Sequence, residues 1–245
     1  MLRMIAVVTT VVVFLILSIP VLGILYLVGR VNPEKRDEIS LSIVRGVFRL
    51  ILFLSGVTVE VQGLENIPKD QAVLYVGNHR SYFDILAGYT TVPGLTGFVA
   101  KKEMQQIPLL STWMNRLKCF FLDRKDIKEG LKTILAAIEQ VKSGVSVWIF
   151  PEGTRNEAPL TELMEFHEGS MKIAQKSGCL IIPVAITGAA QVFEEHEPWI
   201  RPSHICIRYG EPIDLKSLTP AERKFSGAYV RGVIIDMLKE MEAEH

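Results

Sequence analysis

The sequence is poor in cysteine and carries no excess of either charge. The three cysteines, Cys119, Cys179 and Cys206, lie far apart among 245 residues and none has CxxC spacing. This spacing argues against a disulfide framework or a zinc site and favours a reducing compartment. Lys and Arg together number 27, as do Asp and Glu, so the net charge is zero. Nucleic-acid-binding proteins usually carry a clear basic excess, so we expect no nucleic-acid partner.

Charge is absent altogether from one N-terminal segment. No charged residue occurs from Met4 to Gly29, a run of 26 residues. A helix of this length can cross a hydrocarbon core of about 30 Å. A cleaved signal peptide would have an apolar region about half as long and a small-residue cleavage site, whereas this run ends in "YLVGRVNPEKRDE". We therefore expect a helix inserted deeply into a membrane, with Pro20 and Gly23 able to kink its second half.

A second apolar segment, from Ile39 to Leu54, is interrupted by Arg45 and Arg49. These arginines are four residues apart and share one face of a helix, while the other face is apolar. We expect this helix to lie at the membrane interface. The predicted organisation is a membrane-associated pair of helices in residues 1–56 and a second domain in residues 57–245.

The second domain alternates strand and helix patterns. The predicted strands are short, β-rich runs: Val57–Val61, Ala72–Val76, Gly97–Ala100, Cys119–Leu122, Val145–Phe150, Leu180–Ile186 and Ile205–Tyr209. Helical spacing is clearest from Ile127 to Val141, and a terminal helix is expected from Arg223 to Glu244. Residues 194–203 are predicted to form a surface loop. This alternation predicts an α/β fold with a mostly parallel central sheet flanked by helices, in which Val57–Val61 is an edge strand.

The stretch "VLYVGNHRSYFD" places polar residues directly after a charge-free strand. In a continuous helix, His79 and Asp84 would point about 140° apart. They can meet only if His79 lies in the turn and Asp84 in the helix that follows. Asp84 would then accept a hydrogen bond from one ring nitrogen and leave the other free as a base. The alternative is Ser81 as a nucleophile, although it lacks a nucleophile-elbow sequence.

Cations follow three other predicted strands. In "FPEGTR", Gly153 permits close backbone approach, Glu152 can accept hydroxyl hydrogens, and Arg155 offers a fork suited to phosphate oxygens. Arg124 follows "FFLD" and Lys101 follows "GFVA". Ligands of open α/β sheets bind beyond the carboxyl ends of the strands, so these cations predict an anion site. A structural turn with a solvated salt bridge is the alternative for "FPEGTR" read alone.

At these motifs the chain resembles the glycerophospholipid acyltransferases, most of all the bacterial 1-acylglycerol-3-phosphate acyltransferases. "NHRSYFD" matches their HxxxxD motif, "FPEGTR" matches their second signature, and "IIPVAITG" around Pro183 resembles their last block. The resemblance covers Val57 to Glu211, and the N-terminal helix pair is similar too. The chain departs from the family pattern at Lys118-Cys119, where a glycine is usual, and at His167, where relatives often have lysine.

The resemblance implies transfer of a fatty acyl group to the sn-2 hydroxyl of lysophosphatidate, which gives phosphatidate. It implies a donor that is acyl-CoA or acyl carrier protein, no metal or cofactor, and a cell-membrane location with the catalytic domain on the cytoplasmic side. His79 and Asp84 would be catalytic. The residues expected to bind substrate are Lys101, Arg124, Glu152, Gly153, Thr154 and Arg155.

Three alternatives stay open at the sequence level. The acceptor could be another molecule, such as glycerol 3-phosphate or a lyso-aminolipid. The chain could be a non-catalytic membrane scaffold, against which the intact His79, Asp84 and Arg155 argue. It could also be a lipid hydrolase that uses Ser81 and needs no acceptor.

Overall fold

A single seven-stranded sheet organises the chain, of which the computed structural model describes residues 1–124 and 126–244. The strand order is β1-β7-β6-β2-β5-β3-β4, and every neighbouring pair is parallel except β6 with β7. The strands are β1 (Val57–Gln62), β2 (Leu74–Gly77), β3 (Thr96–Lys101), β4 (Phe120–Leu122), β5 (Ser146–Ile149), β6 (Ile181–Thr187) and β7 (Ser203–Tyr209). The predicted mostly parallel α/β sheet, with β1 at its edge, is confirmed.

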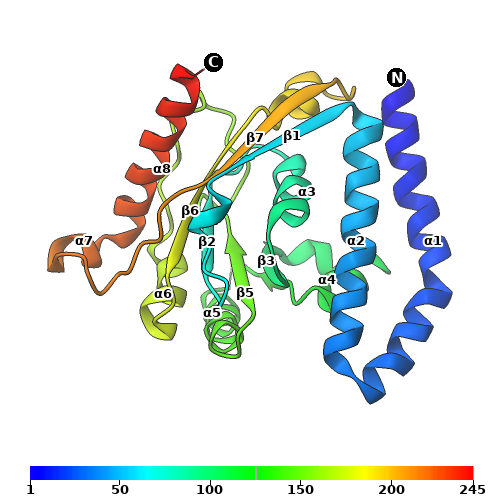
Figure 1. Ribbon diagram of the computed structural model, residues 1–245, viewed down its shortest axis with the longest axis horizontal. Coiled ribbons are helices and arrows are strands. Elements are labelled where there is room, and N and C mark those ends of the chain that lie inside the picture. The colour runs from blue at the N-terminus through cyan, green and yellow to red at the C-terminus, as the bar shows by residue number, and fades with distance from the viewer. Residues whose placement is uncertain (125, 245) are drawn as a thin grey trace.

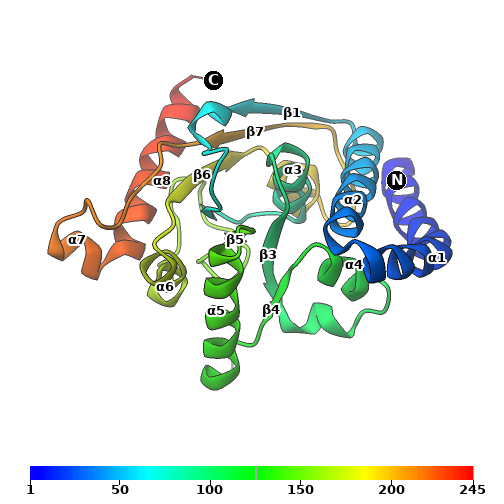
Figure 2. The ribbon, with the colours of Figure 1, turned by 60° about the horizontal axis from the view of Figure 1, so that its bottom comes forward.

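Helices cover both faces of this sheet (Figures 1 and 2). One face packs against α2 (Pro33–Ser55), α3 (Tyr82–Thr91) and α4 (Leu110–Arg116), and the other against α5 (Ile127–Lys142), α6 (Glu168–Ser177) and α8 (Ser226–Ala243). In the described residues, the remaining helices are α1 (Leu2–Val31), α7 (Pro220–Lys224) and four 3₁₀ turns, η1 (Leu64–Asn66), η2 (Lys102–Gln106), η3 (Ala190–Val192) and η4 (Glu194–His196).

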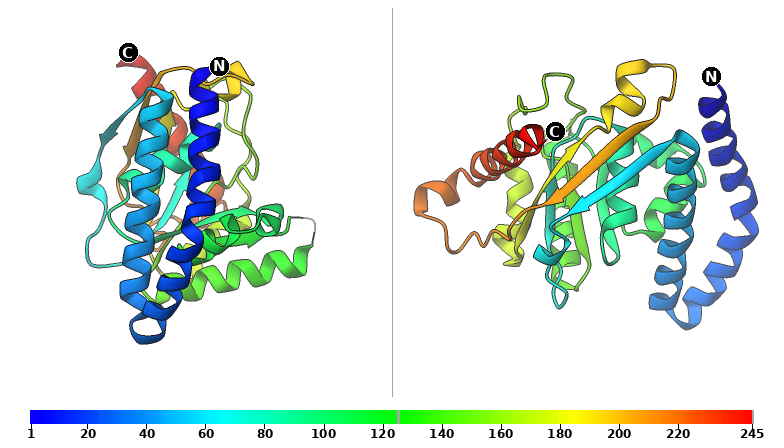
Figure 3. Two further views of the ribbon diagram at one scale, coloured as in Figure 1. Left: turned by 90° about the vertical axis from the view of Figure 1, so that its right-hand side faces the viewer. Right: turned by 45° about the horizontal axis from the view of Figure 1, so that its top comes forward.

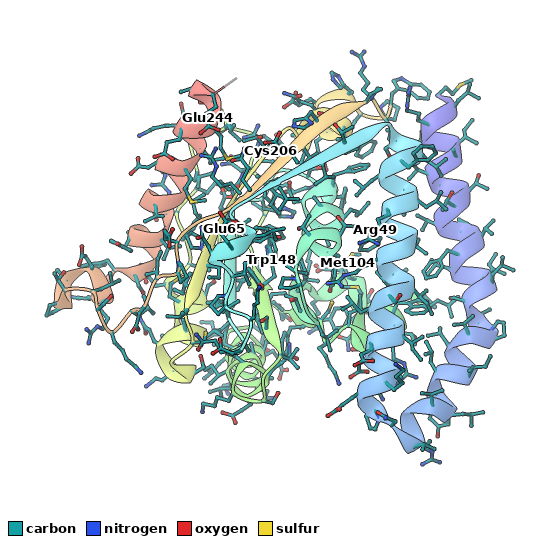
Figure 4. All side chains as sticks on the ribbon, viewed as in Figure 1. Arg49, Glu65, Met104, Trp148, Cys206 and Glu244 are labelled. Carbon is teal, nitrogen blue, oxygen red and sulfur yellow. The ribbon has the colours of Figure 1, made fainter. Side chains whose placement is uncertain are left out.

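Burial on both faces explains why β2 carries no charge. Its side chains alternate between the two cores, with Tyr75 on the side of α3 and Leu74 and Val76 on the side of α6. Trp148 of β5 stacks on Tyr75, at a distance of 5.2 Å between ring centroids, and lies in the middle of the domain (Figure 4). The sheet therefore presents a rigid platform from which the polar turns depart.

The N-terminal helices form an outer layer on one side of the domain. Within the described chain, α1 alone is long and apolar enough to cross a membrane, and it bends in its second half, where Pro20 lies (Figure 1). Helix α2 packs between α1 and the domain, and its Leu41 and Ile51 belong to the same core as Phe83 of α3. One core thus runs across residue 56, and the division into two domains stays a prediction.

The two arginines that interrupt α2 have different surroundings. Arg49 is exposed, whereas the Arg45 guanidinium turns into the domain. It donates hydrogen bonds to the carbonyl oxygens of Tyr89 (2.9 Å), Val92 and Gly94 (3.5 Å) at the end of α3. The last carbonyls of a helix have no partner within it, so Arg45 caps α3 from a neighbouring helix.

The C-terminal helix begins and ends differently from the sequence expectation. Instead of one helix from Arg223 to Glu244, the structure has α7 and α8, because Phe225 leaves the helical region at φ −115° and ψ 47°. A capping box between Thr219 and Glu222, with Pro220 in the first turn, starts α7 early. The predicted loop at 194–203 contains the short turn η4 and a buried Ile200.

Lys118 occupies the left-handed region of backbone space, at φ 59°. A glycine adopts this conformation without steric cost, which gives a physical reason for the glycine expected near this position. Here the Lys118 Nζ lies 3.0 Å from an Asp37 carboxylate oxygen on α2. The strained residue therefore supplies an ion pair between the segment before β4 and the N-terminal helices.

Replacing Arg45 with Met should lower the free energy of unfolding by about 1.5–3 kcal/mol, since the apolar chain leaves the α3 carbonyls without donors. Arg49→Met removes the same group from an exposed position and should change stability by less than about 0.5 kcal/mol. Chemical unfolding of both variants in detergent measures the difference. Equal, small effects would show that Arg45 does not cap α3.

Candidate active site

The exit of β2 is fixed by a buried amide. The Asn78 side chain accepts a hydrogen bond from the Ile186 N–H (2.8 Å) and donates one to the Ile186 carbonyl oxygen (2.9 Å). Asn78 is fully buried, and Ile186 belongs to the neighbouring strand β6. The chain therefore turns away from the sheet at a defined point and releases His79 at the carboxyl end of the strands.

His79 and Asp84 meet across this turn. The His79 Nδ1 lies 2.9 Å from the Asp84 Oδ2, with His79 in the turn and Asp84 in the first turn of α3, so the predicted geometry is confirmed. The same oxygen accepts hydrogen bonds from the backbone N–H groups of Arg80 and Ser81, both at 2.8 Å. Three donors on one oxygen leave the Asp84 side chain, which is 1% exposed, little freedom.

Ser81 has a structural part in the same turn. It is fully buried, and its hydroxyl oxygen accepts a hydrogen bond from the Phe83 N–H at 2.9 Å. Together with Asp84 it forms the capping box that starts α3. A buried capping hydroxyl cannot reach a substrate carbonyl, so the interpretation of Ser81 as a nucleophile is not supported.

The His79 ring has a stacking contact on its face in addition to the hydrogen bond of its Nδ1 with Asp84. It stacks on Phe150, with ring centroids 4.2 Å apart and planes 14° apart. An Nδ1–H group satisfies Asp84, which leaves Nε2 with a free lone pair. The side chain is 16% exposed, so this nitrogen is the part that can meet a ligand.

Glu152 joins the turn after β5 to the turn after β2. Its Oε1 accepts from the His79 N–H (2.9 Å), and its Oε2 accepts from the Asn156 side chain (2.9 Å) and the Met164 N–H (3.0 Å). Burial raises the pKa of Glu152 and these hydrogen bonds lower it, with a net upward shift. Both oxygens are engaged and the residue is 3% exposed, so direct contact between Glu152 and a substrate stays a prediction.

Arg155 is held beside the start of α3. Its guanidinium lies over the Tyr82 ring, 4.2 Å from the centroid, and donates to the Glu194 Oε1 at 2.9 Å. That oxygen also accepts from the Tyr82 N–H, whereas Glu194 Oε2 is buried and has no hydrogen-bond partner among the described residues. Partial burial lowers the pKa of Arg155, the hydrogen bond to Glu194 raises it, and the net shift is upward. Arg155 is thus permanently charged and oriented.

Gly153 brings a second basic side chain to the same turn. At φ +78°, a Cβ on Gly153 would lie 3.1 Å from the His167 Nε2 and 3.7 Å from the Arg124 Cζ. Only glycine fits this backbone conformation and this close approach without strain. Arg124 and Arg155 therefore both flank the "EGTR" turn, as the sequence predicted. Thr154, within that turn, is exposed.

Among the described residues, the contacts given for this turn do not include Lys101. Its side chain is 64% exposed and its Nζ lies 3.5 Å from a Glu103 carboxylate oxygen. A part for Lys101 in anion binding stays a prediction.

Several residues of the site carried no sequence signal. Glu194 lies 39 residues beyond Arg155 in a segment predicted to be a surface loop, and Asn156 follows the motif without belonging to it. His167 was visible only as a departure from the family pattern. Nothing in spacing or periodicity indicated that these side chains meet.

Two cavities of the described part of the chain lie at opposite ends of the sheet. One, of about 270 Å³, adjoins the His79–Asp84 turn and is lined by Arg80, Asp84, Leu160 and Gln191, among others. The larger, of about 540 Å³, lies at the opposite end of the sheet, where Tyr209 ends β7, and contains none of the predicted site residues. The lining of the smaller cavity thus includes Asp84 but not His79.

Comparison with known proteins identifies the family. A family model described as "Acyltransferase" matches residues 58–187, more than half of the chain. The chain belongs to the acyltransferase family. The resemblance inferred from the two motifs is confirmed.

Individual relatives agree with the family. A protein named 1-acyl-sn-glycerol-3-phosphate acyltransferase from Borreliella burgdorferi is 29% identical over 205 residues, which span 84% of this chain and 81% of that protein. The human protein named 1-acyl-sn-glycerol-3-phosphate acyltransferase alpha is 25% identical over 94% of this chain and 77% of its own length. The crystal structure of the 1-acyl-sn-glycerophosphate (LPA) acyltransferase PlsC from Thermotoga maritima shares the fold, with a TM-score of 0.82 and 27% identity, over 99% of this chain and 95% of that chain.

Replacing Glu152 with Gln should destabilise the protein by about 1–3 kcal/mol. All three partners of the carboxylate are donors, so the amide NH₂ must face a donor in either orientation. Glu165→Gln, at an exposed position of the same segment, should change stability by less than about 0.5 kcal/mol. Unfolding of the two variants tests this, and an unchanged Glu152→Gln protein would contradict it.

Proposed function

We propose that this acyltransferase moves a fatty acyl group from an acyl thioester to the sn-2 hydroxyl of 1-acylglycerol 3-phosphate, giving phosphatidate. The observation that carries the proposal is the hydrogen bond of 2.9 Å between His79 Nδ1 and Asp84 Oδ2 beside the Arg155 turn. The names of the relatives support the acceptor.

His79 acts as the general base in this proposal. Its free Nε2 takes the proton of the acceptor hydroxyl while the hydroxyl oxygen attacks the thioester carbonyl carbon. The imidazolium that forms is stabilised by Asp84. When the carbon–sulfur bond breaks, the departing thiolate takes the proton from His79, and an ester and a free thiol result. A thioester is already activated, so no covalent enzyme intermediate is needed.

The basic side chains at the "EGTR" turn select the acceptor by binding its phosphate group. A phosphate monoester carries nearly two negative charges at neutral pH and several acceptor oxygens. Arg155 donates one N–H group to Glu194 and has further N–H groups that can bind such oxygens. The Arg124 guanidinium lies close to Gly153 in the same turn. An acceptor that carries a phosphate beside its hydroxyl suits this arrangement.

A lipid acceptor also accounts for α1. Lysophosphatidate has one acyl chain and resides in a membrane surface, and α1 exposes a long apolar surface on the outside of the molecule (Figure 3). We propose that α1 holds the enzyme on the cell membrane, with the catalytic domain on the cytoplasmic side. Either acyl-CoA or acyl carrier protein serves as the donor.

A panel of acceptors tests the proposal directly. Release of the thiol from each donor is measured with lysophosphatidate, glycerol 3-phosphate, a lyso-aminolipid and no acceptor. We expect turnover with lysophosphatidate to exceed that with the others. Equal thiol release without an acceptor would indicate a hydrolase, and no turnover with any acceptor would indicate a scaffold.

His79→Ala should reduce kcat by a factor of about 10²–10⁴, through loss of the general base. Asp84→Asn should also be severely slowed, because an amide can hold the ring in the wrong tautomer. Ser81→Ala is the control within the same turn: it should lose about 0.5–2 kcal/mol of stability, as a helix cap does, yet keep most of its kcat. Retention of half the wild-type kcat in folded His79→Ala would end the proposal for this residue.

Arg155→Ala should weaken use of lysophosphatidate by roughly 2–4 kcal/mol, as expected for breaking a close charge pair. Arg155→Lys should recover part of this loss, since it restores the charge without the fork. Monoacylglycerol, which has the hydroxyl but no phosphate, should be a poor acceptor whose kcat/KM falls little further. An equal fractional loss of kcat/KM on both acceptors would mean that Arg155 does not bind the phosphate.

A further inference from the structure

Exposed large apolar side chains of the α/β domain gather at one end of its sheet. Outside α1 and α2, nine such side chains are exposed in the described chain, and seven of them lie in segments that follow the carboxyl ends of β2 to β6. Tyr82, Ile107, Met164 and Trp199 each follow a different strand. The strands β2 to β6 are parallel, so these side chains share the end of the sheet that carries His79.

Helix α5 contributes the other three. Ile127 is 87% exposed, and Leu131 and Leu135 are each 53% exposed. Their spacing of four residues aligns them in one stripe, and Ile138 and Val141, further along nearly the same face, pack against the sheet. One apolar side of α5 therefore serves the core in its later turns, whereas Ile127, Leu131 and Leu135 belong to neither hydrophobic core of the described residues.

The position of α5 places this stripe at the outside of the domain, at the end of the sheet that carries His79. Helix α5 begins after β4, at the same end of the sheet as His79, and its first turns extend outward from the body of the domain (Figure 3, left). In Figure 2, α1, the segment around α4 and the lower end of α5 follow one another along the lower right side of the molecule. One flat surface can therefore contact α1 and α5 together.

The charge of the segment around α5 indicates which kind of surface the stripe would contact. Residues 101–132 contain eight Lys and Arg against four Asp and Glu, whereas the whole chain is neutral. At the apolar tip itself, Lys128 follows Ile127 between Asp126 and Glu129, and Lys132 pairs with Glu129 at 2.6 Å. Apolar side chains flanked by lysine are suited to the interface of an anionic membrane, where hydrophobic and electrostatic attraction add.

We propose that Ile127, Leu131 and Leu135 of α5 form a second membrane contact, which rests the carboxyl end of the sheet on an anionic lipid surface. This inference rests on the proposed function, in which the acceptor and the product are anionic lipids. Contact through α1 alone leaves the domain free to rotate about it. A second contact beside the site fixes the orientation, so that His79 faces the lipid from which the acceptor comes.

Quenching by brominated lipid measures the contact itself. Leu131→Trp in the full-length protein is compared with Phe225→Trp, a matched control at a position 56% exposed between α7 and α8, away from this end of the sheet. The unmodified protein provides the background. On vesicles of brominated phosphatidylcholine and phosphatidate, the added Leu131→Trp fluorescence should be quenched and shifted to the blue, whereas that of Phe225→Trp should not. Equal quenching of the two would overturn the proposal.

Turnover tests the consequence. With acyl-CoA as donor, Leu131→Glu should lower kcat/KM by about tenfold for lysophosphatidate in vesicles, and should leave kcat/KM unchanged for a short-chain, water-soluble analogue. An equal loss on both acceptors would overturn the proposal. The assay is repeated with acyl carrier protein as donor. A loss confined to that donor would also overturn the proposal, because the stripe would then be a surface that docks the carrier. If the unmodified protein used no lysophosphatidate, the proposed function would fail, while the quenching result would still decide the contact.

Discussion

One carboxylate oxygen, Oδ2 of Asp84, connects the fold to the chemistry. It accepts hydrogen bonds from two backbone N–H groups at the start of α3 and from the His79 ring. The N-terminus of a helix favours negative charge, so the same charge stabilises α3 and orients the imidazole. The arrangement constrains the chain strictly, because His79 must lie before the cap residue Ser81 and Asp84 must be the third residue of the helix. The five-residue spacing of the motif follows from this geometry.

A second buried carboxylate connects the two motifs to each other. Glu152 accepts from the His79 backbone N–H, and the Asn156 backbone N–H donates to the His79 carbonyl oxygen at 2.8 Å. The turn after β2 and the turn after β5 are therefore one hydrogen-bonded unit, although 73 residues separate His79 from Glu152. Phe150 completes the unit through its stacking contact with the His79 ring. The distance between the His79 ring and the "EGTR" turn is thus set by backbone groups and by the core, and not by exposed side chains.

The sequence predicted the features that depend on local pattern and on strand direction. The seven strands and the His79–Asp84 contact follow from charge-free runs, turn residues and helical geometry, all of which act over a few residues. The pairing of Arg155 with Glu194 spans 39 residues and depends on how the segment after β6 folds back, which no periodicity records. The prediction for Arg45 failed for another reason. A charged residue on an amphipathic helix is expected to face solvent or headgroups, whereas Arg45 donates hydrogen bonds to carbonyl groups at the end of α3. The break at Phe225 likewise depends on a local cap that competes with helix propagation.

In the proposed function, anion binding at Arg155 would depend on several groups in balance. Glu194 places a carboxylate against the arginine that would meet a phosphate, and the stack on Tyr82 fixes the plane of the guanidinium. This lowers the conformational entropy that binding would cost, while the negative charge opposes an incoming anion. Arg124, whose guanidinium carbon would lie 3.7 Å from a Cβ on Gly153, adds positive charge at the same turn. In the proposed function, an acceptor phosphate meets an arginine already oriented by its competitor, Glu194, and Arg124 adds to the attraction.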